Sequence, residues 1–232
     1  MLKEVSPQTA AWEAQARHDR LSKRFATLSK RTNLVALAPG TGKSTLTALL
    51  NEALARKVDP MRFVEYHLER LPRSVHYNAE GLREFLGFLP PEVLYFADAD
   101  SVHDSPDPYW RSRVENLRLM TEKTGYRPLG AYEELILDFW EQAQPSQIPK
   151  VLLCNNYGGE EAPWFTLRAK LPCKETERRW RGRIAPDMPD DQVERVLRRQ
   201  RRAWHDLTGD VLSYSDIVQA LVRLATTAGL TG

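Results

Sequence analysis

The residues best suited to chemistry stand in the run from Pro39 to Ser44, which combines two glycines with a lysine and a serine. Glycines let a backbone bend closely around a phosphate chain, and the amides of such a turn donate hydrogen bonds to it. The lysine ammonium adds a positive charge, and the hydroxyl beside it is a ligand for Mg²⁺. The run therefore predicts a loop that binds the phosphates of ATP together with Mg²⁺.

Each part of this phosphate loop has an expected role. Lys43 is expected to reach the β- and γ-phosphates, and Ser44 to bind Mg²⁺. Leu37 stands where the usual eight-residue pattern begins with glycine, so the turn is about two residues short. The residues expected to bind the nucleotide are Pro39, Gly40, Thr41, Gly42, Lys43, Ser44 and Thr45.

Carboxylates that follow predicted strands are the next candidates. Asp98 and Asp100 follow a short apolar run, the position of an acid that orients Mg²⁺ or accepts a proton. Glu65 lies near the end of a second predicted strand, residues 62–67, and is a candidate base or acceptor-binding acid. Asp98 is also, with Ser44, a predicted metal ligand.

Two arginines complete the predicted site. Arg179 and Arg183 stand four residues apart, and this spacing places both on one face of a helix. Guanidinium groups stabilise transferring phosphates, and a segment rich in them is typical of a lid that closes over the nucleotide. The predicted catalytic residues are therefore Lys43, Glu65, Asp98, Asp100, Arg179 and Arg183.

The elements that position these residues alternate between strand and helix along the chain. A strand over residues 33–38, the glycine turn and an apolar helical stripe over residues 46–54 give the order that a phosphate loop requires. Further strands are predicted at residues 62–67, 93–97, 150–154 and 211–214, and helices at 5–30, 79–88, 109–124, 130–144 and 189–207. A loop is expected over residues 101–109, and a last helix capped by Ser215 or Asp216.

This alternation predicts an α/β fold, in which a P-loop NTPase-type parallel sheet has helices on both faces. We expect one kinase-like domain over residues 1–232, with a leading helix at 5–30 and an arginine-rich lid at 165–190. The insertion between residues 109 and 150 is the expected place for acceptor specificity.

The amino-acid composition is that of a globular protein. Of 232 residues, 42% are hydrophobic and 28% are charged, the balance of an ordinary globular chain. No apolar run reaches the roughly 18–20 residues that span a bilayer, and the first residues lack the pattern of a secretory signal. Only two cysteines occur. We therefore expect a cytoplasmic protein without a membrane partner; the oligomeric state stays open.

Basic residues gather in one stretch although the net charge is only +2. Residues 167–202 contain twelve Arg or Lys against six Asp or Glu, a local excess of +6. Such an excess fits phosphate or nucleic-acid binding, or a solvated helix face.

Five further features resemble the P-loop kinases of the uridine kinase and pantothenate kinase type, in particular the fungal uridine-kinase-like ATPases. They are Val35-Ala36-Leu37-Ala38 before the loop, Tyr66-His67-Leu68, Tyr77-Asn78-Ala79-Glu80-Gly81-Leu82, Asp100 with Pro106, and Asn156-Tyr157 followed by Glu161-Ala162-Pro163-Trp164. The resemblance implies kinase activity towards a nucleoside-like or vitamin-like hydroxyl. Two acids of that family fall on Val64 and Cys154 here.

Three functions are consistent with this sequence. The first is an ATP- and Mg²⁺-dependent phosphotransferase that acts on a small hydroxylated acceptor. The second is a polynucleotide 5′-kinase or toxin-type kinase, which the basic stretch favours, although a nucleic acid is the less favoured partner. The third is a nucleotide-binding module or weak ATPase without transfer activity, favoured by the residues at Val64 and Cys154.

Overall fold

The structure is a computed structural model that describes residues 6–70, 96–124, 130–142, 150–155, 163–184 and 188–230. The chain forms two compact units. Unit 1 is drawn from residues 1–31 and 99–148, and unit 2 from residues 32–98 and 149–232.

Unit 2 is built on a five-stranded sheet in which every pair of neighbouring strands is parallel. The strands are β1 (Asn33–Leu37), β2 (Phe96–Asp98), β3 (Val151–Asn155), β4 (Phe165–Lys170) and β5 (Asp210–Val211), in the order β2-β3-β1-β4-β5. The predicted α/β class with a parallel sheet is therefore confirmed. Strand β1 lies in the middle of the sheet, with β3 and β2 on one side and β4 and β5 on the other. The turn that follows β1 therefore lies at the point where the strand order changes direction. This is the edge at which open α/β sheets bind ligands.

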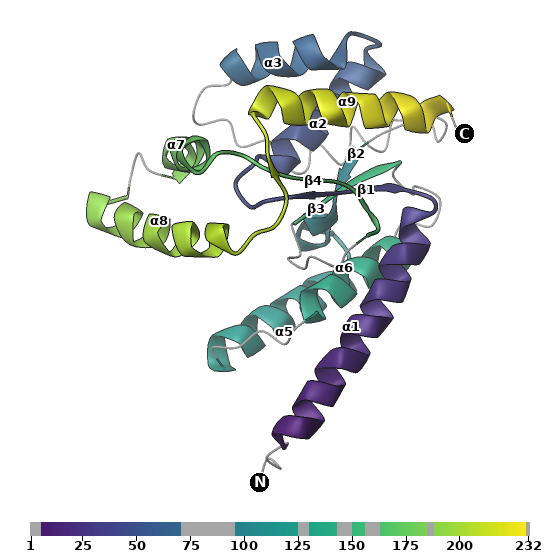
Figure 1. Ribbon diagram of the computed structural model, residues 1–232, viewed down its shortest axis with the longest axis vertical. Helices are drawn as coiled ribbons and strands as arrows, with labels where there is room; N and C mark the ends of the chain where they lie inside the picture. Colours follow the sequence, from purple (N-terminus) through teal and green to yellow (C-terminus); the bar gives the residue numbers. More distant parts are fainter. Residues whose placement is uncertain are drawn as a thin grey trace. The chain divides into compact units, whose positions relative to one another are not determined.

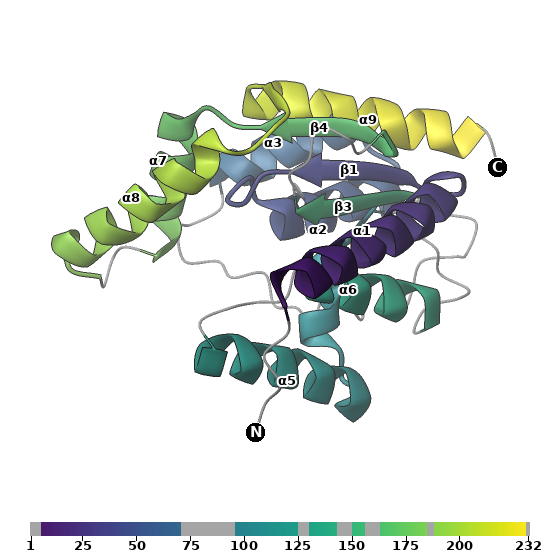
Figure 2. The ribbon, with the colours of Figure 1, turned by 60° about the horizontal axis from the view of Figure 1, so that its bottom comes forward.

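Three helices cover one face of this sheet, namely α2 (Lys43–Ala55), α3 (Pro60–Arg70) and α9 (Tyr214–Leu230) (Figure 1). Val35, Leu37 and Leu153 of the strands are fully buried against apolar side chains of these helices. Figure 2 shows β1 and β3 side by side, with α9 above them. The core therefore fixes the start of α2 relative to the carboxyl end of β1.

The predicted strand over residues 62–67 is wrong, because this segment lies in helix α3. Asp59 accepts a hydrogen bond from the Met61 amide at 3.0 Å, and Pro60 stands at the first helical position. Val64 is fully buried while its neighbours are half-buried or exposed, which is the pattern of a helix packed on one side. The start signals at Asp59 and Pro60 outweigh the short apolar run.

The first residues of the expected lid form a strand of the sheet. Residues 165–170 form β4, which pairs with β1 on one side and β5 on the other. Phe165, Leu167 and Ala169 alternate with polar residues, the period of a half-buried strand. The rest of the basic stretch forms helices α7 (Cys173–Ile184) and α8 (Asp190–His205).

Other predicted elements differ in their limits. The expected strand at 93–97 is described only as β2, and the expected helix at 79–88 lies outside the described residues. The expected loop at 101–109 is replaced by a 3₁₀ helix, η1 (Ala99–Asp104), and the start of a helix at Pro108. The strand expected at 211–214 is β5, which ends at Val211, and α9 begins at Tyr214. The cap of α9 is Ser213, not Ser215 or Asp216 as expected. The Asp216 amide donates to the Ser213 hydroxyl at 3.1 Å, and the Ser213 amide donates back to Asp216 at 3.2 Å.

Unit 1 contains α1 (Pro7–Ser29), η1, α5 (Pro108–Thr124) and α6 (Ala131–Gln142), which confirms the predicted helices at its start and in the insertion. Asp138 of α6 accepts hydrogen bonds from Arg24 of α1 at 2.9 Å and from Arg113 of α5 at 2.8 Å. This carboxylate therefore ties the three helices together.

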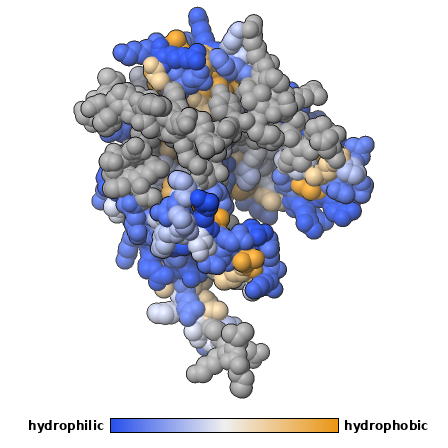
Figure 3. Space-filling model, turned by 180° about the vertical axis from the view of Figure 1, so that it is seen from behind, coloured by the Kyte–Doolittle hydropathy of each residue, from blue (hydrophilic) through white to orange (hydrophobic). Residues whose placement is uncertain are grey.

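In the part of the chain that the structure describes, no helix is both long and apolar enough to span a bilayer. On the face seen in Figure 3, the coloured surface is mostly hydrophilic and its hydrophobic residues form small separate groups.

Candidate phosphate-binding site

The turn after β1 has a defined backbone geometry. The Ala38 carbonyl accepts hydrogen bonds from the Thr41 amide at 3.4 Å and from the Thr41 hydroxyl at 2.9 Å. Pro39 precedes Gly40, whose φ of +82° is the value that a type II turn needs at its third residue. The short loop is therefore a proline-glycine turn closed on Ala38, rather than a truncated copy of the longer loop.

Gly42 then adopts a second left-handed conformation, with φ of +83°, and is the N-cap of α2. Gly42 has no side chain that could accept hydrogen bonds from the first amides of the helix, as a serine or aspartate cap does. The helix begins at Lys43, whose side chain is only 8% exposed. The predicted order of strand, glycine turn and helix is confirmed. The positive end of the α2 dipole therefore lies at this turn.

Ser44 and Asp98 are brought together as predicted. The Ser44 hydroxyl donates a hydrogen bond of 2.8 Å to the Asp98 carboxylate. Ser44 lies in the first turn of α2 and Asp98 is the last residue of β2. A hydroxyl and a carboxylate oxygen at this distance are hard ligands, of the kind that Mg²⁺ takes together with water and phosphate oxygens. The residues present therefore fit a magnesium ion.

Asn51, which the sequence analysis missed, positions Asp98. Its amide donates to the Phe96 carbonyl at 2.7 Å and its side-chain oxygen accepts from the Phe96 amide at 2.6 Å. Strand β2 lies at the edge of the sheet, so Asn51 pairs the backbone groups that face away from β3. Asn51 is fully buried on the apolar face of α2. A polar residue on such a face is the signal that could have identified it.

Helix α7 packs directly on the glycine turn. A Cβ atom added at Gly40 would lie 3.0 Å from the Cγ2 atom of Thr176, a residue that is 5% exposed. The Thr176 amide and hydroxyl both donate to the Pro172 carbonyl, at 3.0 and 3.3 Å. Thr176, also missed by sequence reasoning, therefore fixes the start of α7 against the phosphate loop, and Gly40 cannot gain a side chain without strain.

Arg179 lies one turn further along α7, in a helix as predicted, and is held by groups of the protein. Its Nε donates to Glu175 at 2.8 Å, and its guanidinium carbon lies 3.7 Å from the centre of the Tyr214 ring. The pKa of Glu175 is lowered, because Arg178 and then Arg179 donate hydrogen bonds to it. The side chain of Arg183 lies outside the described residues.

Glu65 does not lie at the end of a strand, where the sequence analysis expected it. It lies in α3, and its carboxylate accepts a hydrogen bond of 3.0 Å from the Ser215 hydroxyl at the start of α9. This bond joins two helices that cover the same face of the sheet. Asp100 belongs to η1 in unit 1, and its side chain lies outside the described residues.

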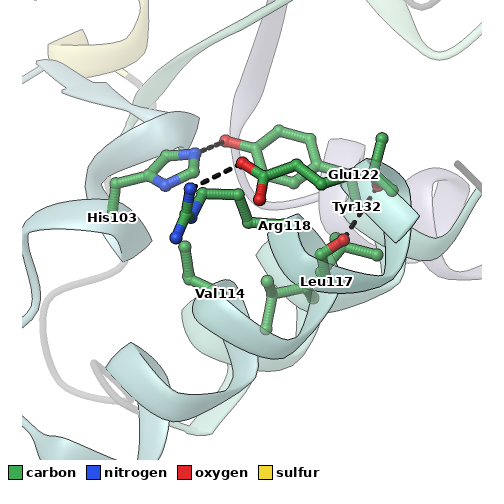
Figure 4. Close-up of a pocket in the computed structure, with 8 residues that line it drawn as sticks. His103, Val114, Leu117, Arg118, Glu122 and Tyr132 are labelled. Carbon is green, nitrogen blue, oxygen red and sulfur yellow. Dashed lines mark hydrogen bonds and ion pairs between the residues drawn. The ribbon is translucent and has the colours of Figure 1, made fainter. Parts of the chain in front are cut away.

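Unit 1 has a hollow of its own, with a volume of about 320 Å³ (Figure 4). It is lined by apolar side chains from α5 and α6 and by Tyr132 and His103. The Tyr132 hydroxyl and His103 share a hydrogen bond of 2.6 Å. Arg118 at its edge is already paired with Glu115 and Glu122, at 2.6 Å each. The guanidinium group beside this hollow is therefore already paired within the protein.

Among the described residues, no group of three or more His, Cys, Asp or Glu side chains is arranged to hold a metal ion. Ser44 and Asp98, the two predicted metal ligands, are joined by a hydrogen bond. Comparisons of the chain with models of protein families, with curated proteins and with solved structures give no match.

Proposed function

We propose that unit 2 binds a nucleoside triphosphate with Mg²⁺ at the glycine turn and transfers its terminal phosphoryl group to a small hydroxylated acceptor. The observation that carries the proposal is the 2.8 Å hydrogen bond between Ser44 and Asp98. It joins the first turn of the helix after the phosphate loop to a carboxylate from a separate strand. Ser44 directly follows the buried Lys43, and Asp98 ends β2 at the carboxyl edge of a parallel sheet.

The residues of the site have separable tasks. The start of α2 offers backbone amides and a positive dipole end to the phosphates, and Lys43 offers an ammonium group. Ser44 and Asp98 would hold Mg²⁺, which supplies charge neutralisation on the phosphates when bound. In such a site the protein contributes mostly positioning and electrostatic stabilisation.

The Mg²⁺ part of the proposal predicts a specific loss. In Ser44→Ala and in Asp98→Asn, we expect Mg²⁺ to add little to ATP affinity, because the first variant removes an oxygen ligand and the second removes the negative charge of the carboxylate. Isothermal titration with ATP, with and without Mg²⁺, measures this difference. Ser215→Ala is the matched control, because its hydroxyl bonds to Glu65 in the same unit. An undiminished Mg²⁺ effect in both site variants would contradict the assignment.

A second candidate function is a nucleotide-binding module without transfer. Two predicted catalytic side chains are engaged elsewhere, since Arg179 is bound by Glu175 and Tyr214, and Glu65 by Ser215. Neither arrangement offers a described base or clamp beside Ser44. This favours binding without chemistry over the polynucleotide kinase alternative, for which the loop itself offers no specific contact.

A transfer assay separates the two candidates. The protein is incubated with γ-labelled ATP and Mg²⁺ and with nucleosides, pantothenate-like alcohols or oligonucleotides with a 5′-hydroxyl. We expect label in a nucleoside or an alcohol, and none with Asp98→Asn. Label only in oligonucleotides would favour the polynucleotide kinase. No labelled acceptor, together with normal binding of ATP, would reject transfer and leave the binding module.

A further inference from the structure

The outer face of α8 carries four arginines, which we call the arginine stripe: Arg195, Arg198, Arg199 and Arg202. Residues three and four apart are neighbours on a helix, so the four share one face over two turns. All four are exposed. Val193 and Leu197, which are buried, project from the opposite side of the same helix. The stripe therefore faces solvent.

The packing of α8 does not use the stripe. Figures 1 and 2 both show α7 and α8 side by side. A different arginine, Arg201, joins them by donating two hydrogen bonds to Glu177, at 2.5 and 3.0 Å, and one to Glu194 at 2.9 Å. The pKa of Glu177 is lowered chiefly by these bonds from Arg201. The ion pairs between α7 and α8 therefore come from residues of α8 that do not belong to the stripe.

The stripe has weak internal partners. Arg195 lies 3.7 Å from Asp191 and Arg198 lies 3.9 Å from Glu194, with both arginine side chains 70% exposed. Arg199 and Arg202 form no ion pair with any residue that the structure describes. Like charges three or four residues apart repel each other on a helix. The concentration of arginines therefore opposes helix stability, and a polyanionic partner would relieve it.

We propose that the arginine stripe binds the phosphate backbone of a nucleic acid. Guanidinium groups match phosphate oxygens with two parallel hydrogen bonds. Arg195 and Arg202 lie seven positions apart, a rise of about 10 Å along the helix, close to the axial length of about three phosphates on one strand of duplex DNA. A linear row of this length favours a polymer of phosphates over a single anion.

The opposite face of α8 favours nucleic acid over a lipid surface. A helix that binds a membrane surface inserts apolar side chains beside its basic ones. In α8 the side chains of Val193 and Leu197 are already buried, at 2% and 0% exposure. These two side chains are therefore not available to insert into a membrane. This inference does not depend on the function of the phosphate loop.

The test is fluorescence anisotropy of the full chain with a labelled DNA duplex and with its single strand, at increasing salt. The stripe variant is Arg198→Gln, Arg199→Gln, Arg202→Gln. The control variant removes the same charge from exposed positions elsewhere in unit 2, as Lys57→Gln, Arg62→Gln, Arg223→Gln. We expect the wild type to bind at about 50 mM salt, and the stripe variant to bind at least about tenfold more weakly. The salt slope should fall by about one for each phosphate that the variant no longer neutralises.

Arg199→Gln alone provides a second variant, because this side chain forms no ion pair among the described residues, and its salt slope should fall by about one. Lys43→Ala should leave oligonucleotide binding unchanged, which separates this proposal from the phosphate loop. Three results would overturn it: no binding of either DNA at low salt, equal losses in the stripe and control variants, or binding to phosphatidylserine vesicles but not to DNA. Thermal melting without ligand checks that the variants fold.

Discussion

Lys43→Ala is expected to weaken the binding of ATP by about 30- to 150-fold, because a hydrogen bond from a charged group contributes about 2–3 kcal/mol. Lys43 is buried at the start of α2, directly after the turn closed by Gly40 and Gly42. In the proposed site its ammonium group would pair with the phosphates that bind at this helix start. Removal of this charge leaves the backbone amides, which are a weaker anion site by themselves.

Thermal unfolding measures this loss directly. At an ATP concentration about 100 times the dissociation constant, the wild type should be stabilised by about 2.7 kcal/mol. A variant that binds about 100-fold more weakly should gain only about 0.4 kcal/mol at the same concentration. Lys57→Ala, an exposed lysine just after the same helix, is the control and should respond as the wild type does. An equal response in Lys43→Ala would remove the basis of the proposed function.

The glycine turn was predictable because its signal is local. Pro39, two glycines and Lys43 stand between an apolar run and an amphipathic stripe, and each of these patterns specifies its own conformation. The approach of Asp98 to Ser44 was also predictable, since both follow strands whose carboxyl ends share one edge. Local patterns together with parallel topology thus predict both halves of the site.

The errors arose where local signals compete or where partners are distant in sequence. The segment around Glu65 contains a short apolar run that suits a strand, but the cap at Asp59 and the burial of Val64 favour a helix. In β4, the alternation that fits Ala169 between two strands stands at the start of the basic stretch, which was assigned to a lid as a whole. The partner of Arg179, Tyr214, is 35 residues away, and no local pattern indicates such a contact.

Asn51 links the fold to the site in a way that sequence patterns do not reveal. Both backbone groups of Phe96 are paired by this one side chain, at 2.7 and 2.6 Å. Among the described residues, Asn51 therefore takes the place of a neighbouring strand on the side of β2 that faces away from β3. Because Asp98 ends the same strand, the position of its carboxylate depends on this side chain of α2.

Asn51→Leu is expected to lower the free energy of unfolding by about 2–5 kcal/mol, because two buried backbone groups lose their partners while the side chain keeps its approximate size. Urea denaturation measures the change. Thr47→Val, one turn earlier in α2, is the matched control. Thr47 is buried at 1% exposure, and its hydroxyl has no hydrogen-bond partner among the described residues. Its replacement should therefore change the stability by less than about 1 kcal/mol.

The same substitution also has a consequence for the site. If Asn51 holds β2, then Asn51→Leu should reduce the Mg²⁺-dependent part of ATP binding even under conditions in which the variant is folded, whereas Thr47→Val should retain it. A stability close to that of the wild type would show that the pairing to β3 alone holds the strand. A destabilised variant with full Mg²⁺ dependence would show that Asp98 is positioned independently of Phe96. Only the loss of both properties supports Asn51 as the residue that connects the edge of the sheet to the metal-binding pair.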